Sequence, residues 1–305
     1  MTTIPPPSPP PIYPISTETL FSDNPSRDKR NKEGLVFKHF LKKGFRGIGV
    51  ENQPIYDLFF HLGFEKFLLK PNWKKWDKNK TIRDYPHLTE HLNYPFEIEK
   101  KSTNPKLEED RKNITTHREW VDKQFCNVPL EWMYSDECIY LNGNSLLFGE
   151  GVYYQMFKEE IDDFIDNELP NRDIPLMMKE NYDKVKVMRE KYKTLFIWGG
   201  MEGDTETLEI IYNNLPLKLV QFIMKKQFEN FYRYRSGFMD CWMWNKKDKH
   251  LKLVEVKGIR EDILPHQHEW LNIFYDYGVD VSVLRVKIQK YINDSRVDAL
   301  LKSPH

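Results

Sequence analysis

The sequence predicts an α/β protein in which a large helical portion precedes a compact end that contains a β-hairpin. Two short apolar runs, 241–245 and 251–257, flank the polar turn "NKKDKH" and indicate the hairpin. Apolar side chains at helical spacing, most strongly over residues 215–232, indicate the helical portion. No internal repeat is evident, and a single domain of this kind is the simplest interpretation.

The first residues, "MTTIPPPSPPPIYP", lack the charged and apolar regions of a signal peptide and are typical of a polyproline tail. We expect residues 1–32 to form a disordered Pro-rich tail and basic linker, with the tail available to dock a partner protein. No apolar run approaches the roughly 18 residues needed to span a bilayer, so no membrane partner is expected. Three cysteines in 305 residues are no disulfide framework, which favours a reducing compartment inside the cell.

The rest of the chain is expected to divide into an N-terminal helical part with an insertion, 33–194, and a core, 195–305. In the first part, "NKEGLVFKHFLKK" predicts a short helix closed by Gly44, and "GFRGIGV" predicts a Gly-rich connector. A second helix opens near Glu51, which shares the apolar face of that helix. Residues 150–192 predict two helical pieces separated by "NELPNRDIPL".

The 46 basic and 46 acidic residues cancel, which neither predicts nor excludes a polyanionic partner. Their distribution is uneven, because residues 65–80 interleave six lysines with two tryptophans. Basic stretches with aromatic residues can follow phosphates and stack on bases. Three lysines are therefore candidates for DNA contacts, with a solvated loop as the alternative: Lys74, Lys75 and Lys78.

Three charged residues interrupt the apolar hairpin: Asp240, Glu255 and Lys257. Charged groups rarely occur among such residues unless they are paired, bound to metal or functional. Side chains alternate along a strand, so Glu255 and Lys257 point to the same face. Asp240 stands near the start of the preceding strand, and the start of one antiparallel strand lies beside the end of the next. We therefore expect the three charges to meet at one rim of the sheet.

Two neighbouring carboxylates repel unless a cation lies between them or one of them takes up a proton. Mg²⁺ and Mn²⁺ suit ligation by carboxylates, a backbone carbonyl and water, with a substrate phosphate in the open positions. A nearby lysine can then neutralise a developing oxyanion or orient a water molecule. The alternative is a buried salt bridge at the end of a strand, and the three residues alone do not decide between the two.

The flanking segments resemble a known family. The stretch "RSGFMDCWMWNKKDKHLKLVEVKG", followed by "HQHEWL" and "GVDVSVLRV", is similar to the VRR-NUC nuclease domain, particularly that of the Fanconi-associated nucleases. Upstream, "GFRGIGVENQPIYDLFF" is similar to the segment that carries the family's other active-site glutamate. The resemblance covers roughly residues 34–70 and 195–288. The positions that match the motifs near the end of the chain are Gly237, Asp240, Trp244, Asn245, Glu255, Lys257, Gly258, Gln267, Trp270 and Leu271.

The resemblance implies an α/β, restriction-endonuclease-like core of the PD-(D/E)xK type, in which helices flank a mixed sheet and a helical insertion is present. It implies that Asp240, Glu255 and the Val256 carbonyl ligate Mg²⁺ or Mn²⁺. Lys257 would orient the water and stabilise charge in the transition state. Glu51 would hold a metal-bound water or a second ion.

Three other residues are expected near the substrate. Gln267 lies on the sheet-facing side of its helix, where it contacts substrate or Lys257 unless it is a buried amide satisfied by backbone. Arg233 and Arg235 precede the hairpin and are expected to grip the phosphates beside the scissile bond, with simple solvation as the alternative.

The sequence departs from the family's pattern at two places. Met239 stands where the family has a proline before the catalytic aspartate, which is expected only to loosen a turn. The stretch "REDILP" replaces a basic segment after the second strand. We expect this change to remove a phosphate contact, which Arg260 or His266 replaces in part.

Together, these observations predict a metal-dependent, structure-selective DNA nuclease. The resemblance implies cutting near 5′ flaps or branched ends, with 5′–3′ exonuclease action, as in DNA repair or interstrand crosslink processing. We expect a monomer acting on branched, flapped or single-strand-containing DNA, in the nucleus of a eukaryote and in the cytoplasm otherwise. The alternatives are a Holliday-junction resolvase-like homodimer and a DNA-binding protein that keeps the fold without cutting.

Overall fold

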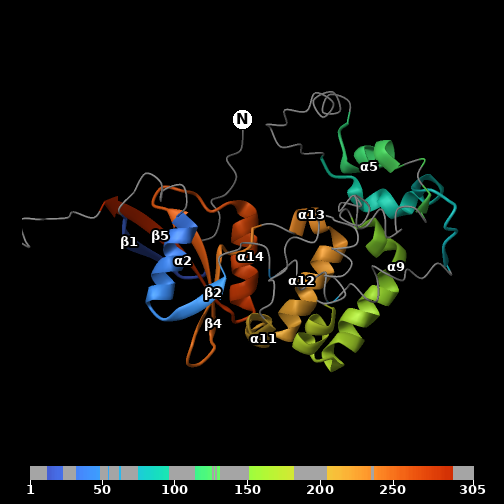
Figure 1. Ribbon diagram of the computed structural model, residues 1–305. Helices are drawn as coiled ribbons and strands as arrows, with labels where there is room; N and C mark the ends of the chain where they lie inside the picture. The colour runs from blue at the N-terminus through green and yellow to red at the C-terminus, as the bar shows by residue number, and fades with distance from the viewer. Residues whose placement is uncertain are drawn as a thin grey trace, which may run out of the picture. The chain divides into compact units, whose positions relative to one another are not determined.

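The computed structural model describes residues 12–22, 32–48, 54, 62, 75–95, 114–125, 127, 129–130, 151–181, 205–234 and 237–290. The chain divides into a sheet unit, Met1–Asn52 with Gly237–His305, and a helical unit, Gln53–Ser236 (Figure 1). The sheet unit is therefore built from both ends of the chain. This division differs from the expected boundaries, which place the break between the helical part and the core at residue 194.

The sheet unit contains a five-stranded mixed sheet with the strand order β1-β5-β4-β3-β2. Strands β1, β5 and β4 are parallel, whereas β3 is antiparallel to both β4 and β2. The predicted hairpin is confirmed, with Cys241 of β3 opposite Val254 of β4. The elements of this unit are β1 (Ile15–Ser22), α2 (Lys32–Lys42), β2 (Phe45–Ile48), β3 (Cys241–Asn245), β4 (Leu251–Gly258), α14 (Pro265–Asp276) and β5 (Asp280–Lys290).

The two described helices of this unit cover opposite faces of the sheet. Val36 and Phe40 of α2 pack into an apolar cluster with alternate residues of β3, β4 and β5. Because side chains alternate along a strand, Cys241 belongs to this cluster and Trp242 faces the other side. There, Phe274 of α14 meets the Trp242 ring edge-on, with ring centroids 6.0 Å apart. The expected mixed sheet flanked by helices is thus confirmed.

The segment expected to be only a Gly-rich connector contains strand β2, which pairs with β3. Gly47 lies opposite Met243, and a β-carbon on Gly47 would come within 2.2 Å of the Trp242 carbonyl oxygen. Only glycine lets the two backbones approach this closely. The residue that suggested a loop is therefore the one that permits the pairing.

The predicted disorder of residues 1–32 is wrong for Ile15–Ser22, which form the edge strand β1. The Pro14 carbonyl accepts a hydrogen bond from the Val283 amide at 2.9 Å, and β1 continues from there along β5. Leu20 is 4% exposed and belongs to the apolar cluster under α2. The Pro-rich flank conceals the strand in the sequence because its pairing partner lies near the other end of the chain.

In the helical unit, Val220, Met224 and Phe228 are buried on one face of α12, as predicted. The predicted helix is interrupted at Asn230, which has an extended backbone and separates α12 from α13. The predicted break within 150–192 is confirmed, because the helix that starts with α9 gives way to the single-turn elements η5 and η6. The elements here are η3 (Ile82–Asp84), η4 (Pro86–Leu92), α5 (His117–Phe125), α9 (Val152–Asp163), η5 (Phe164–Glu168), η6 (Leu169–Asn171), α11 (Thr205–Asn214), α12 (Leu217–Glu229) and α13 (Phe231–Tyr234).

Hydrogen bonds from side chains to backbone carbonyls connect these helices. Gln221 of α12 donates to the Ile165 carbonyl at 2.7 Å, and the Trp76 indole donates to the Met156 carbonyl at 3.0 Å. Within the described ranges, no helix is both long enough and apolar enough to cross a membrane.

The place of β1 in the core gives a first prediction. Leu20→Ala should lower the free energy of unfolding by about 2–5 kcal/mol, the usual cost of removing a buried leucine side chain. Thr17→Ala, at an exposed position of the same strand, should change it by less than about 0.5 kcal/mol. Urea denaturation of both variants measures the difference. Equal, small effects would mean that this segment does not belong to the folded core.

Candidate active site

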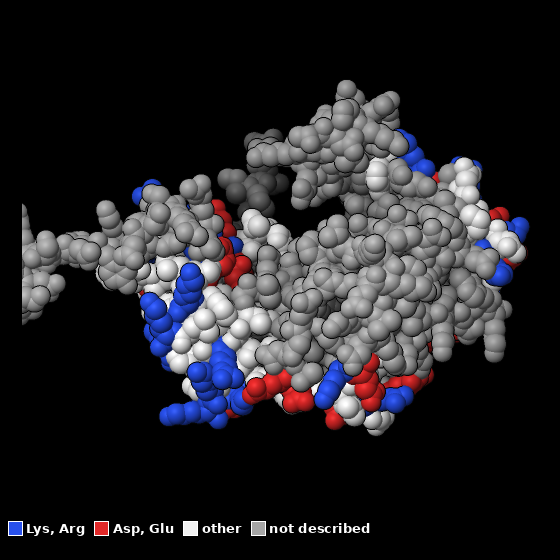
Figure 2. Space-filling model, in the orientation of Figure 1, with Lys and Arg blue, Asp and Glu red and all other residues white. Residues whose placement is uncertain are grey.

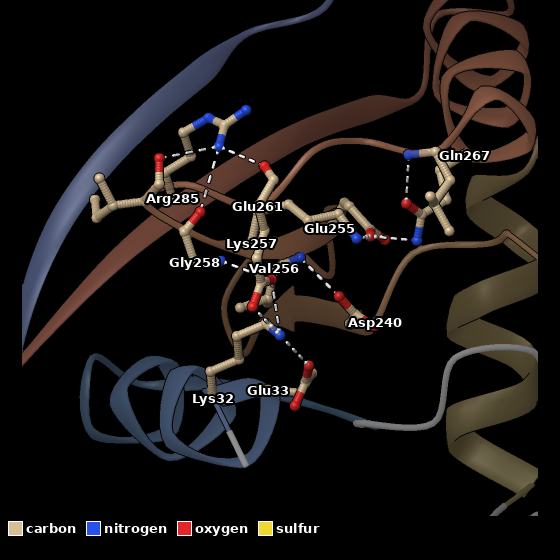
Figure 3. Close-up of polar contacts among 12 residues, drawn as sticks. Lys32, Glu33, Asp240, Glu255, Val256, Lys257, Gly258, Glu261, Gln267 and Arg285 are labelled. Carbon is tan, nitrogen blue, oxygen red and sulfur yellow. Dashed lines mark hydrogen bonds and ion pairs between the residues drawn. The ribbon is translucent and has the colours of Figure 1, made fainter. Parts of the chain in front are cut away.

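The carboxylate of Asp240 lies at the point where β3 begins and β4 continues beyond it. Its Oδ2 accepts the Val256 amide N–H at 2.7 Å. The side chain thus takes the place of a backbone carbonyl that β3 would supply if it extended further. The neighbouring Met239 carbonyl is used elsewhere, because it accepts the Trp242 indole N–H at 3.2 Å. The backbone thus leaves the ladder just before Asp240 and aims that carboxylate back at β4 (Figure 3).

The segment before Asp240 packs on the first turn of α14. Gly237 has a φ of +89°, and a β-carbon there would lie 2.4 Å from Cδ2 of His266. Phe238 is fully buried, and its ring centroid lies 4.3 Å from that of Trp270. The position of Asp240 is therefore set by the same helix turn that carries Gln267.

Glu255 lies inside the sheet at 1% exposure, with charged and polar partners around one oxygen. Its Oε1 is 2.7 Å from the Lys257 ammonium and accepts the Gln267 amide N–H at 2.7 Å. The Gln267 oxygen in turn accepts the Leu264 amide N–H at 3.0 Å, at the start of α14. Gln267 was predicted to reach substrate or Lys257, and the structure places it on Glu255 instead.

Lys257 and Glu255 form the ion pair that the salt-bridge interpretation requires, and both lie where the nuclease interpretation requires them. The Lys257 side chain is 12% exposed, so its ammonium sits at the edge of the buried region. Asp240, Glu255, Val256 and Lys257 are thus brought together at one rim of the sheet, as the alternation of the strands predicted. Glu51, which was predicted to join them, lies outside the described residues.

A carboxylate that was not predicted, Glu33, lies in the first turn of α2 near this rim (Figure 3). Burial, the largest cause, together with the charges of Asp240, Glu33 and Glu255 raises the pKa of the Cys241 thiol to about 12. All three carboxylates are therefore close enough to the buried Cys241 sulfur to affect its pKa. The sequence signal was an acidic residue in the first turn of a helix with a buried face, the same signal that directed attention to Glu51.

The donor set of the rim fits a hard divalent cation. Asp240 and Glu255 offer carboxylate oxygens, and Mg²⁺ is commonly bound by one or two carboxylates together with water and substrate phosphate. Where the structure describes the chain, no three His, Cys, Asp or Glu side chains are close enough together to form a complete metal site. Two carboxylates alone would leave coordination positions for water and a substrate phosphate.

Tyr13 reaches this region from the N-terminal segment, which the sequence analysis assigned to a disordered tail. It is 3% exposed, and its hydroxyl is hydrogen-bonded to Nδ1 of His268, the residue after Gln267. Burial raises the pKa of Tyr13 to about 12, and the charge of Glu255 contributes in the same direction while Arg285 opposes it. The hydroxyl therefore keeps its proton at neutral pH. No local pattern could have predicted this contact, because the two residues come from opposite ends of the chain.

The predicted DNA-binding residues are distributed over both units. Arg260 is exposed in the sheet unit, and Arg233 is exposed in the helical unit with its guanidinium 5.2 Å from the Tyr234 ring centroid. Lys75 pairs with two acids of α9, at 2.8 Å from Glu159 and 3.6 Å from Glu160. Lys78 is exposed, whereas Lys74 and Arg235 lie outside the described residues.

Part of the chain is similar to known nucleases. Residues 177–288 match the model of the VRR-NUC domain. Fanconi-associated nuclease 1 homologues of Caenorhabditis briggsae and Caenorhabditis elegans are 30% and 32% identical to this chain over 92 residues. These 92 residues are 30% of this chain but only 10% and 11% of the two relatives, so the chain spans a small part of their length.

A solved structure shares the fold. The crystal structure of paFAN1 bound to 2nt 5′flap DNA with gap superposes with a TM-score of 0.50 at 15% identity. The match covers 90% of this chain and 38% of that chain. The predicted resemblance to VRR-NUC nucleases and the restriction-endonuclease-like fold are both confirmed.

The contact between Tyr13 and His268 gives a second prediction. Tyr13→Phe removes only the buried hydroxyl and should lower the free energy of unfolding by about 1 kcal/mol, the usual net contribution of a hydrogen bond. Tyr275→Phe on the same helix is a matched control, because Tyr275 is 42% exposed. Chemical denaturation measures both variants. A loss no larger than that of the control would show that the N-terminal segment does not hold α14.

Proposed function

We propose that this chain, which carries a VRR-NUC domain, is a Mg²⁺- or Mn²⁺-dependent nuclease that cuts DNA near 5′ flaps or branches. The observation that carries the proposal is the meeting of Asp240, Glu255 and Lys257 at one rim of the sheet. The carboxylates supply the oxygen donors that a hard cation takes, and the lysine supplies a positive charge beside them.

Each residue of the rim has a task in this proposal. Asp240 and Glu255, with the Val256 carbonyl, would hold the cation, which lowers the pKa of bound water and polarises the phosphate when present. Gln267 fixes the orientation of Glu255 through Oε1. Lys257 would orient the attacking water and balance the negative charge that develops on the phosphate oxygens. Glu51 would add a third carboxylate, as the family resemblance implies.

The ion pair between Lys257 and Glu255 is compatible with this chemistry. A cation bound to Glu255 would compete with the ammonium for that carboxylate, which leaves Lys257 available to the water and the phosphate. The same ion pair supports a second candidate function, a DNA-binding protein that keeps the fold without cutting. In that case the lysine only neutralises a buried glutamate.

DNA is the proposed partner on two grounds. The paFAN1 structure with the same fold contains flapped DNA, and the sheet unit carries exposed basic side chains. Figure 2 shows lysine and arginine side chains gathered over α2 and the turn between β3 and β4. The exposed lysines of these two segments are Lys38, Lys42, Lys246 and Lys247.

We further propose that the chain acts as a monomer in DNA repair or crosslink processing, in the nucleus if its source is a eukaryote. Arg233, Arg235 and Arg260 are the arginines proposed to contact phosphate, together with Lys74, Lys75 and Lys78. The carboxylates of Glu159 and Glu160 compete with phosphate for Lys75, which should reduce its contribution. The Pro-rich tail is proposed to dock a partner protein.

The proposal is tested by neutralising the two carboxylates. Asp240→Asn keeps an acceptor for the Val256 amide, and Glu255→Gln keeps one for Gln267, so the fold should survive in both. Cleavage of flapped DNA with Mg²⁺ should fall by at least about 10²-fold, the loss typical of one electrostatic group. Binding of the same DNA in EDTA should be equal or tighter, because one fewer negative charge faces the phosphates.

Asp276→Asn, at an exposed position at the end of α14, is the matched control and should cut as fast as the wild type. Full Mg²⁺-dependent cutting by both the Asp240 and the Glu255 variant would refute the assigned site. Tight DNA binding by a wild type that never cuts would favour the second candidate function.

A further inference from the structure

The turn that follows β4 lies directly after Lys257 and is held in place by two sets of contacts to its backbone (Figure 3). The Glu261 amide donates to the Gly258 carbonyl at 3.1 Å, which closes the turn. The guanidinium of Arg285 donates through one nitrogen to the carbonyls of Gly258, Ile259 and Glu261, at 3.3, 3.4 and 2.8 Å. The backbone of this turn is therefore fixed independently of the Glu261 side chain.

The carboxylate of Glu261 is surrounded by hydrogen-bond donors and positive charge. One oxygen accepts the Gly258 amide N–H at 2.9 Å, and the Lys32 ammonium lies 2.9 and 3.1 Å from the two oxygens. Partial burial acts to raise the pKa of Glu261, but the Gly258 amide, Lys32 and the nearby charge of Lys257 hold it below its ordinary value. A negative charge at this position is thus stabilised by a backbone amide and two lysines from different elements.

A backbone N–H together with lysine ammonium groups is the donor set that proteins use for phosphate. Glycine suits this position, because no β-carbon at Gly258 crowds a group that approaches the amide. Glu261 itself is 48% exposed and has a flexible side chain, so it can leave without disturbing the turn that Arg285 holds. Exposed ion pairs contribute little to stability, so exchanging the carboxylate for another anion costs little.

We propose that the Gly258 amide and Lys32 form a subsite for a phosphate of the DNA backbone, and that the Glu261 carboxylate competes with the DNA for this subsite. The inference rests on the proposed nuclease function, because Lys257 places the subsite beside the phosphate to be cut. Glu261 belongs to the stretch "REDILP", which the sequence analysis took as the loss of a phosphate contact. In this proposal the contact is retained through Lys32, and an internal anion competes for it.

If Glu261 competes with phosphate, removal of its charge should strengthen DNA binding. If Glu261 only caps the turn, its replacement should weaken DNA binding. Glu261→Gln keeps an acceptor for the Gly258 amide and removes the charge. Binding of flapped DNA is measured in EDTA by fluorescence anisotropy over a range of salt concentrations. The variant should bind several-fold tighter at low salt, and its log–log salt slope should be steeper by up to about 0.9, because a phosphate contact that Glu261 contests in the wild type is made fully.

Lys32→Met removes the side chain proposed to bind the phosphate and is the second variant of the experiment. The double variant with Glu261→Gln should lose the added slope, because no ammonium is left to contact the phosphate. Glu269→Gln, an exposed carboxylate on α14, is the control for a general change in charge and should leave the slope unchanged. Melting temperatures of all variants verify that the fold is intact.

Inorganic phosphate at constant ionic strength distinguishes a DNA phosphate from a free one. It should not raise the melting temperature of Glu261→Gln, because one free phosphate lacks the other contacts of the DNA backbone. An unchanged slope or weaker binding in Glu261→Gln, with wild-type DNA binding intact, would overturn the subsite alone. A wild type that binds no DNA would overturn both the subsite and the proposed function.

Discussion

Burial of the Glu255 carboxylate is the constraint on which the rest of the site depends. An ionised carboxylate at 1% exposure is costly unless it is paired and hydrogen-bonded. Lys257 supplies the charge and Gln267 supplies the hydrogen bond, each 2.7 Å from the same oxygen. The need for Gln267 fixes the start of α14, because its side-chain oxygen also caps the Leu264 amide. One buried charge thus links a strand, a loop and a helix.

The remaining groups of the sheet unit meet around this charge from both ends of the chain. The Asp240 carboxylate accepts a hydrogen bond from the Val256 amide of β4, at a point that β3 does not reach. The segment before Asp240 packs on α14. The hydroxyl of Tyr13, in the N-terminal segment, is hydrogen-bonded to His268 of α14, the residue after Gln267. Lys32, at the start of α2, meets the turn after β4. The charged groups therefore meet at one rim, while apolar contacts hold the two faces of the sheet.

Much of the site could be predicted because period-2 alternation and hairpin geometry are local properties of the sequence. They placed Glu255 and Lys257 on one face and Asp240 beside them. Strand β1 and Tyr13 could not be predicted in this way, because parallel pairing with β5 joins segments from opposite ends of the chain. Glu33 was missed for a different reason, since an acidic residue in the first turn of a helix is common and the sequence alone does not show that α2 packs on this sheet.

The central claim is that the pair of Lys257 and Glu255 performs hydrolysis in addition to stabilising the sheet. The most direct test is the single-turnover rate of flapped-DNA cleavage by Lys257→Met with Mg²⁺, because methionine keeps the apolar stem and removes only the ammonium. We predict a rate about 10²–10⁴-fold below that of the wild type, with DNA affinity retained, as expected for a group that acts in the transition state. A folded variant that cuts as fast as the wild type would contradict the claim.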